Sequence, residues 1–358
     1  MKTKTKIRSL LLLAMMFVIG SANGWCSKPE SVKNKVYNKS FEVSQGDMLT
    51  TDNIYGNTTI TYWDMNEVSI RVEIEVKAKK ETLAQEMLDR IQIKLSKDNN
   101  TISASTSLKK EFNSHGSFSG NLSINYFINM PSQMTINLAQ KYGNINIPAT
   151  TEGKSTIQVK YGNLKAGSFT QPLDLRVKYG DVNVGDLTEA KMDLGYCDAS
   201  SIGNAELLNI DCKYSNIDIK RCDKINISNK YSNVSIESLN KGEMDTKYGD
   251  TEIDSLQESL IIDEMAYCTL DINNLSADFK TLDVDARYGN LNVKVSPEAS
   301  FEVNTENMKY GKHKIKGLNI TSMIEDDDDN NHYKINNGGG GVIRFNGNSY
   351  SSIQVKSL

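Results

Sequence analysis

Residues 141–147 read Lys141-Tyr142-Gly143-Asn144-Ile145-Asn146-Ile147, and the start of this motif returns along most of the sequence. Its tyrosine recurs in steps of 17 to 22 residues at Tyr142, Tyr161, Tyr179, Tyr196, Tyr214, Tyr231, Tyr248, Tyr267, Tyr288 and Tyr310. Outlying copies stand at Tyr55 and Tyr350. A short fixed period indicates a solenoid, in which each repeat stacks on its neighbours. We therefore predict an all-β fold, a single-stranded parallel β-helix of about 12 rungs.

Each repeat contains two short segments of alternating polarity. Counted from the tyrosine, apolar residues recur at −4, −2, +3, +5 and +8, as in the rung of Tyr214 with Ile210, Cys212, Ile217 and Ile219. Alternation with a period of two predicts strands that bury one face. A lone rung cannot offset its ordering entropy, but stacked rungs share a continuous core.

The alternation breaks after the tyrosine, which places a bend there. Position +1 is Gly, Ser or Cys, and position +2 is Asn or Asp in most rungs. Asn and Asp tolerate the left-handed backbone conformation, so we expect position +2 to adopt it. The tyrosine shares the parity of −2 and −4, so we expect it to face inward as a buried, stacked corner residue.

The chain divides into three parts. Residues 1–24 have a basic start and an apolar stretch from Leu10 to Ile19, which is typical of a signal peptide. Cys26 allows a second interpretation, a lipid anchor, but the bulky Trp25 before it favours the unlipidated form. Residues 25–133 hold the first rung and a strand–helix cap, with a helix expected over 81–95, and residues 134–358 hold the repeats. Within them we expect an acidic and glycine-rich loop insertion over 322–341.

The serial Lys-Tyr-Gly-Asn copies from Lys141 on, together with Tyr55-Gly56-Asn57, Ile60 and Trp63-Asp64, resemble the bacterial putative adhesin family. That family is a domain of unknown function related to the putative auto-transporter adhesin head domain. The resemblance implies a β-solenoid on or near the outside of the cell. It supplies no catalytic residues and says little about function, because the family name itself follows from the fold.

The composition restricts the chemistry. The net charge of −4 gives no reason to expect a nucleic-acid partner. The three histidines, His115, His313 and His332, have no metal-ligating neighbours at useful spacing, and we expect no metal or cofactor. Five cysteines make no disulfide framework, and we expect Cys212 and Cys222 to be small buried residues, although they could also face each other within a rung. Phosphate-loop and hydrolase motifs are missing from the sequence, so we expect no enzyme.

The candidate ligand surface is a column of basic residues at position −1. It comprises Lys141, Lys160, Lys178, Lys213, Lys230 and Lys247, with Arg176 at position −3 of the Tyr179 rung. Such a column could attract an anionic polymer. The alternative is a solvated face whose lysines pair with acids at −3, where each pair stabilises little. Only the early rungs, with Ala139, Gln158 and Arg176 at −3, lack such acids.

These patterns leave three functions open. The first is an exported protein of the periplasm, the outer-membrane surface or the exterior that binds an anionic polysaccharide or another surface ligand without catalysis. The second is a structural or envelope-stress protein that acts through an envelope protein partner. The third is a polysaccharide-degrading enzyme, which would need paired carboxylates in a cleft.

Overall fold

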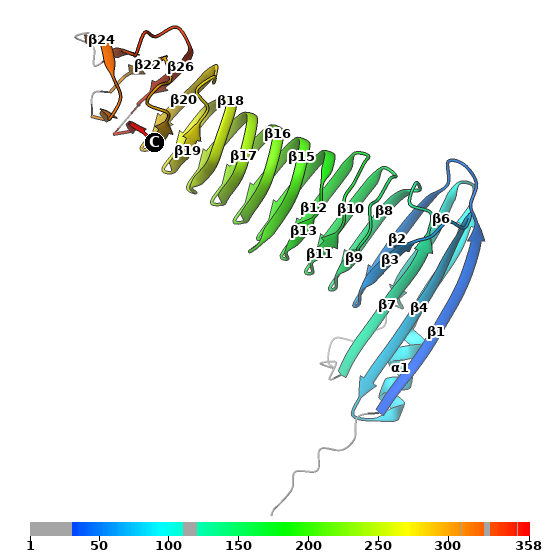
Figure 1. Cartoon of the computed structure of the whole chain (residues 1–358). Coiled ribbons are helices and arrows are strands. Elements are labelled where there is room, and N and C mark those ends of the chain that lie inside the picture. Colours follow the sequence, from blue (N-terminus) through cyan, green and yellow to red (C-terminus); the bar gives the residue numbers. More distant parts are fainter. Residues whose placement is uncertain (1–30, 110–119, 309, 326–329, 349) are drawn as a thin grey trace, which may run out of the picture.

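The computed structural model describes residues 31–109, 120–308, 310–325, 330–348 and 350–358. The segment 1–24, Cys26, His115 and the four aspartates after Glu325 lie outside these ranges. The described chain is nearly all strand, and the strands form one continuous hydrogen-bonded sheet that coils along a single axis (Figure 1). The predicted all-β class is confirmed. No helix within these ranges is both long and apolar enough to cross a membrane.

Parallel pairing between equivalent positions of successive repeats builds the coil. The early repeats use two separate strands each: β8 (Thr135–Lys141), β9 (Ile145–Ile147), β10 (Ser155–Lys160), β11 (Leu164–Ala166), β12 (Leu173–Lys178), β13 (Val182–Val184) and β14 (Leu187–Gly195). The central repeats are longer strands: β15 (Ser200–Lys213), β16 (Asn216–Lys230), β17 (Asn233–Lys247) and β18 (Thr251–Ala266). Only the tyrosine and position +1 separate β15 from β16 and β16 from β17, and three residues separate β17 from β18.

The core lies inside the coil. In β16 the buried residues are Ile217, Ile219, Cys222, Ile225 and Ile227, with Asn229 buried at position −2. The predicted inward positions −4, +3, +5 and +8 are therefore occupied as expected in this rung. Asn229 is satisfied, because its side chain donates to the carbonyl oxygen of Ser232 at 2.8 Å and to the hydroxyl of Thr246 at 3.1 Å.

The N-terminal strands continue the hydrogen-bonded sheet of the coil beyond β8 and β9. The strands are β1 (Ser31–Glu42), β2 (Met48–Ile54), β3 (Thr58–Tyr62), β4 (Glu67–Ala78), β5 (Ile91–Asp98), β6 (Thr101–Leu108) and β7 (Gly120–Met130). Strands β2 and β3 pair in parallel with β8 and β9, so the early copy at Tyr55 stacks directly on the main array. Beyond them, β6 and β7 add on in parallel and then pair antiparallel with β5 and β4.

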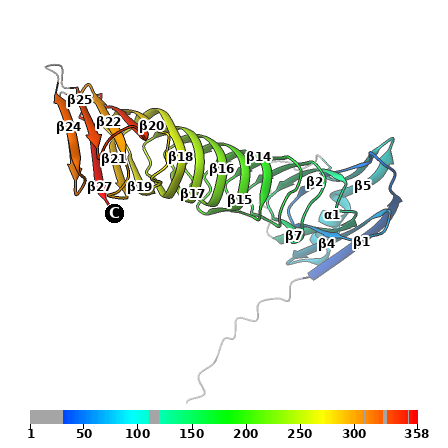
Figure 2. The ribbon, with the colours of Figure 1, turned by 45° about the horizontal axis from the view of Figure 1, so that its top comes forward.

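The one helix of the described ranges is α1 (Glu81–Arg90), which packs against β1 and β4 through Ala84 and Leu88 (Figure 2). The helix expected over 81–95 is too long, because from Ile91 on the chain forms β5. Alternation of Ile91, Ile93 and Leu95 with polar residues suits a strand paired with β6, and this pairing outweighs the helical spacing.

The C-terminal end of the coil departs from sequence order. Its strands are β19 (Thr269–Leu275), β20 (Thr281–Arg287), β21 (Asn290–Val295), β22 (Phe301–Glu306), β23 (Lys312–Lys316), β24 (Ile320–Glu325), β25 (Asn331–Ile335), β26 (Gly341–Asn346) and β27 (Ser352–Ser357). Strand β26 pairs with β20 and β22, and β27 pairs with β21 and β23, all in parallel. The last repeat in the sequence therefore lies between two earlier ones.

The segment 322–341 is not a loop throughout. Strand β24 pairs antiparallel with β25, which pairs antiparallel with β22. The acidic and glycine-rich composition favoured the prediction of a loop, and the alternating pattern over Asn331–Ile335 is too short to indicate a strand by itself.

Candidate functional site

The motif tyrosines form one continuous ladder on the outside of the coil. The order of contact is Tyr55, Tyr142, Tyr161, Tyr179, Tyr196, Tyr214, Tyr231, Tyr248, Tyr267, Tyr288, Tyr350 and Tyr310. From Tyr55 to Tyr288 neighbouring ring centroids lie 4.8–5.1 Å apart. The rings are stacked along the axis, and each remains 38–62% exposed.

The expectation of buried tyrosines is therefore wrong, and the backbone gives the reason. The ladder tyrosines from Tyr55 to Tyr288, and Tyr350, have φ values of 52–60°, whereas position +2 was expected to hold the left-handed residue. A left-handed residue shifts the alternation by one place, so the tyrosine points outward and position +1 points inward. Cys197 and Ser215, both at +1, are buried.

Contacts between rungs hold this strained conformation. A left-handed backbone costs a residue with a Cβ about 1–2 kcal/mol. From Tyr55 to Tyr267, the amide of each ladder tyrosine donates to the carbonyl oxygen at position −1 of the next rung, as from Tyr142 to Lys160 at 3.0 Å and from Tyr161 to Lys178 at 2.9 Å. Stacking adds about 0.5–1.5 kcal/mol per ring pair.

Small residues at +1 allow the rungs to approach. A Cβ on Gly162 would lie 1.9 Å from the carbonyl oxygen of Gly143, which leaves no room for a side chain in that rung. In other rungs a hydroxyl takes part instead: the amide of Cys197 donates to Oγ of Ser215 at 3.2 Å. This restriction to Gly, Ser and Cys is the sequence signal that could have placed +1 inside and the tyrosine outside.

Position +2 forms a ladder of its own. The side-chain oxygen of Asn144 accepts a hydrogen bond from the amide of Asn163 at 2.8 Å, and Asn163 accepts one from the amide of Asp181 at 2.7 Å. The Asn and Asp preference at +2 thus serves to connect rungs.

The predicted basic residues do come together in one column. Strand register places Lys141, Lys160 and Lys178 at adjacent positions, and likewise Lys213, Lys230 and Lys247. The two halves differ in their acidic neighbours: within the described residues, one of the three early lysines has one, and two of the three later lysines do, Lys230 being the exception. The ammonium groups of Lys213 and Lys247 lie near the carboxylates of Asp211, at 3.7 Å, and Glu264, at 2.5 Å.

Lys141 and Lys160 make no ion pair among the described residues. Their Nζ atoms lie 4.9 and 5.2 Å from the ring centroids of Tyr142 and Tyr161. Lys178 lies 3.6 Å from Asp193.

A shallow hollow of about 320 Å³ gathers the early basic residues. It is lined by Lys141, Lys160, Arg176 and Lys178, with Asp52 and Asp193 as its acidic members. Arg176 also lies 3.7 Å from Asp174, which partly offsets its charge. The hollow remains the most basic stretch of the predicted column.

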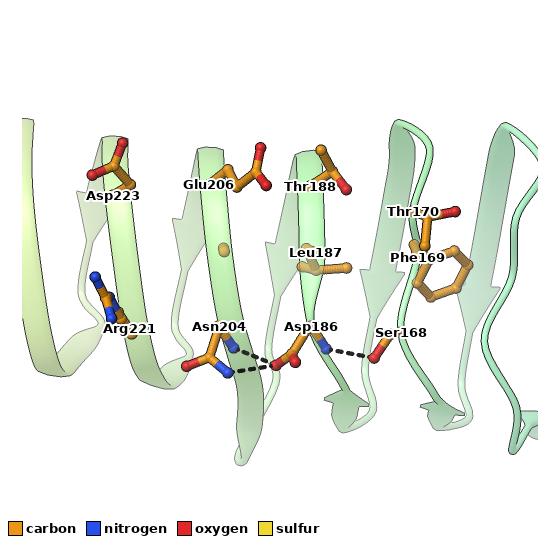
Figure 3. Close-up of a pocket in the computed structure, with 11 residues that line it drawn as sticks. Ser168, Phe169, Thr170, Asp186, Leu187, Thr188, Asn204, Glu206, Arg221 and Asp223 are labelled. Carbon is orange, nitrogen blue, oxygen red and sulfur yellow. Dashed lines mark hydrogen bonds between the residues drawn. The ribbon is translucent and has the colours of Figure 1, made fainter.

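A second hollow, of about 570 Å³, is lined by a different set of residues (Figure 3). Its acidic residues are Asp186, Glu206 and Asp223, and Arg221 lies among them. One oxygen of Asp186 accepts hydrogen bonds from the amide of Asn204 at 2.8 Å and from its side-chain nitrogen at 2.9 Å, so Asp186 connects rungs. This is where a polysaccharide-degrading site would have its carboxylates.

The cysteines inside the described ranges are buried and free, as expected for small core residues. Burial raises the pKa of the Cys212 and Cys222 thiols to about 12. His313 is half-buried, with its ring centroid 5.7 Å from that of Tyr333. The described part of the chain holds no group of three His, Cys, Asp or Glu side chains arranged to bind a metal ion.

No family model and no curated protein matches the sequence. Solved structures do resemble the fold. One named a putative adhesin, from Parabacteroides distasonis, is 12% identical, with 90% of this chain and 97% of that one covered and a TM-score of 0.37. Another of that name, from Parabacteroides merdae, is 11% identical, with coverage of 90% and 96% and a TM-score of 0.34.

A third structure, named a putative lipid binding protein from Parabacteroides distasonis, is 11% identical over 66% of this chain and 94% of that one, with a TM-score of 0.36. Proteins named putative adhesins are thus among the solved structures that this chain resembles. Nothing about a ligand follows from likenesses this distant.

Proposed function

We propose that this chain is an exported, non-catalytic binding protein of the cell envelope or the exterior, which holds an anionic polysaccharide on the outer face of its coil. The repeat of about 12 rungs supplies a long regular surface, and the N-terminal strand–helix segment covers its first end. The observation that carries the proposal is the basic hollow of Lys141, Lys160, Arg176 and Lys178 beside the tyrosine ladder.

Charge decides where the ligand binds. Lys141 and Lys160 make no ion pair within the described ranges, so an incoming acid group need not displace a carboxylate. Lys213 and Lys247 already have acidic neighbours, and an anion there would compete with them. The positive charges of the early rungs also attract a polyanion toward them before it binds.

Substitution at the two ends of the column tests the proposal. A variant with Lys141→Glu, Lys160→Glu and Lys178→Glu should lose salt-sensitive binding to acidic polysaccharides on a glycan array. The matched variant Lys213→Glu, Lys230→Glu and Lys247→Glu should keep most of it. Equal binding by both variants, or no binding of the unmodified protein to any acidic glycan, would contradict the proposal.

The enzymatic alternative has its own test at the second hollow. Incubation with the glycans that bind, followed by detection of new reducing ends, should give no product. Product formation that stops in a Glu206→Gln variant would make the protein an enzyme instead.

A further inference from the structure

Three tyrosines of the early part of the ladder present their hydroxyl groups in a row. Tyr142, Tyr161 and Tyr179 are 41–45% exposed, and their hydroxyl groups make no hydrogen bond to the described part of the chain. Each half-exposed ring leaves roughly 100 Å² accessible, so the ladder as a whole presents on the order of 1,000 Å². An exposed aromatic surface of that extent marks an interaction site.

Stacking decides which part of each ring a ligand can reach. Interplanar angles of 7–11° between Tyr142, Tyr161 and Tyr179 mean that the ring faces cover one another. The exposed parts are the ring edges and the hydroxyl groups. Ring edges carry the positive part of the aromatic quadrupole, and a hydroxyl can donate a hydrogen bond. The strip therefore suits a ligand rich in oxygen acceptors, and it does not suit sugar faces that stack on flat rings.

The spacing of the row distinguishes between polymers. Centroids of the three rings are separated by 5.1 and 4.9 Å. An extended peptide advances about 3.3–3.4 Å per residue, so its side chains on one face repeat at about twice that distance and lose register with the ladder. A pyranose ring linked through opposite positions advances by a length close to one rung. An extended polysaccharide can thus place one sugar per rung when it runs along the axis.

Lysines precede most of the ladder tyrosines, but at the early end two neighbouring ones make no ion pair within the described residues. The ammonium groups of Lys141 and Lys160 lie within 5.2 Å of the centroids of Tyr142 and Tyr161. The acid groups of those sugars that face the hydroxyl row would also be near these cations. Around Tyr214 and Tyr248 the preceding lysines are next to carboxylates.

We infer that the ladder from Tyr142 to Tyr179 is a binding strip for an extended acidic polysaccharide that lies parallel to the coil axis. The tyrosine hydroxyls donate hydrogen bonds to its oxygens, and Lys141 and Lys160 neutralise its acid groups. This inference rests on the proposed function and specifies the ligand class, its direction and the role of the tyrosines.

Removal of the hydroxyls alone tests this strip. The triple variant Tyr142→Phe, Tyr161→Phe and Tyr179→Phe keeps the stacked rings and so should fold as the unmodified protein does. The matched control is Tyr214→Phe, Tyr231→Phe and Tyr248→Phe. The probe is an eight-unit oligogalacturonate, with its fully methyl-esterified form as the uncharged counterpart and a three-unit oligomer as the short one.

We expect the early triple variant to weaken binding at least about tenfold, since each hydrogen bond contributes measurably and a tenfold change needs little more than one of them. The control triple should change affinity less than about twofold by the same reasoning. The methyl ester should bind poorly, and the three-unit oligomer more weakly than the eight-unit one.

Unchanged affinity in the early triple variant, with binding still lost in the lysine variant, would overturn the strip and leave the proposed function standing. Equal loss in both tyrosine triples would overturn its placement. A second copy of the chain repeats at the same spacing, so light scattering is recorded as well. One result would overturn the polysaccharide and make a second copy of the chain the occupant of the strip: the unmodified protein self-associates without binding the oligosaccharide, and the early triple variant abolishes this association.

Discussion

Replacement of one central ladder tyrosine gives the sharpest test of the rung architecture. Tyr214 has a φ of 52°, is half-exposed and stacks at 4.9 Å on both Tyr196 and Tyr231. Tyr214→Ala removes two ring contacts of about 0.5–1.5 kcal/mol each and a half-buried side chain of about 1 kcal/mol. We expect the free energy of unfolding to fall by about 2–4 kcal/mol.

Tyr214→Gly loses the same contacts but also removes the backbone strain of the left-handed conformation. Glycine should therefore be more stable than alanine at this position, by about 1 kcal/mol. At Asp218, an exposed position within β16 that has no positive φ, the order should be reversed, with glycine about 0.5–1 kcal/mol less stable than alanine.

Urea unfolding followed by far-UV circular dichroism measures both pairs of variants. Midpoints and slopes are compared within each pair, because a stacked array can unfold in more than one step. If alanine is as stable as or more stable than glycine at position 214, as it should be at 218, the left-handed tyrosine does not store strain and the reasoning fails.

Three further predictions concern the core and the turns. Gly162→Ala should lower the free energy of unfolding by about 1–3 kcal/mol, because its Cβ would overlap a carbonyl oxygen of the preceding rung. A Cβ on Gly195 would meet nothing closer than 3.8 Å. Gly195→Ala should therefore be tolerated in the same urea assay. The buried carboxylate of Asp47 accepts a hydrogen bond from Lys97 at 2.6 Å, which holds the pKa of Asp47 below its usual value. Its contribution is full above the unfolded pKa of about 3.9 and is lost as the pH falls through the folded pKa, so Asp47→Asn should destabilise at pH 7 and cost little in strong acid. Burial raises the pKa of Cys212 to about 12, so the free energy of unfolding should fall as the pH rises above about 8.5, where the thiol ionises in the unfolded chain. In denaturant titrations, Cys212→Ala should reduce this fall with pH by up to about 1.4 kcal/mol per pH unit.

Much of the fold could be predicted from local patterns. Alternation with a period of two in Leu173–Lys178 or Asn233–Ile236 is a property of a few neighbouring residues, so strands and their inward faces follow directly from it. The tyrosine period predicted which residues are equivalent in successive rungs. Parallel pairing then places equivalent residues side by side, and this forms the column of Lys141, Lys160 and Lys178. The binding role of this column stays a prediction.

The tyrosine orientation was missed because it depends on contacts between rungs. The parity of the flanking strands placed the tyrosine inside, and by composition Asn or Asp at +2 was the better left-handed residue. In the structure the amides of the tyrosines from Tyr55 to Tyr267 donate to carbonyl oxygens of the next rung, and stacking offsets the strain. The helix expected over 81–95 failed for a similar reason, since β6 recruits Ile91–Asp98 as a strand.

By itself the sequence determined the all-β class, the period and the residues that share a column, because these depend on alternation and repetition along the chain. Only the tertiary structure decided that the tyrosines form an exposed ladder, that Tyr350 stacks between Tyr288 and Tyr310, and that basic side chains meet in one hollow. Parallel edges accept any strand of matching register, so the order of rungs is set by which edge the last segment can reach and pair with. The spacing of residues along the chain does not specify which edge that segment pairs with.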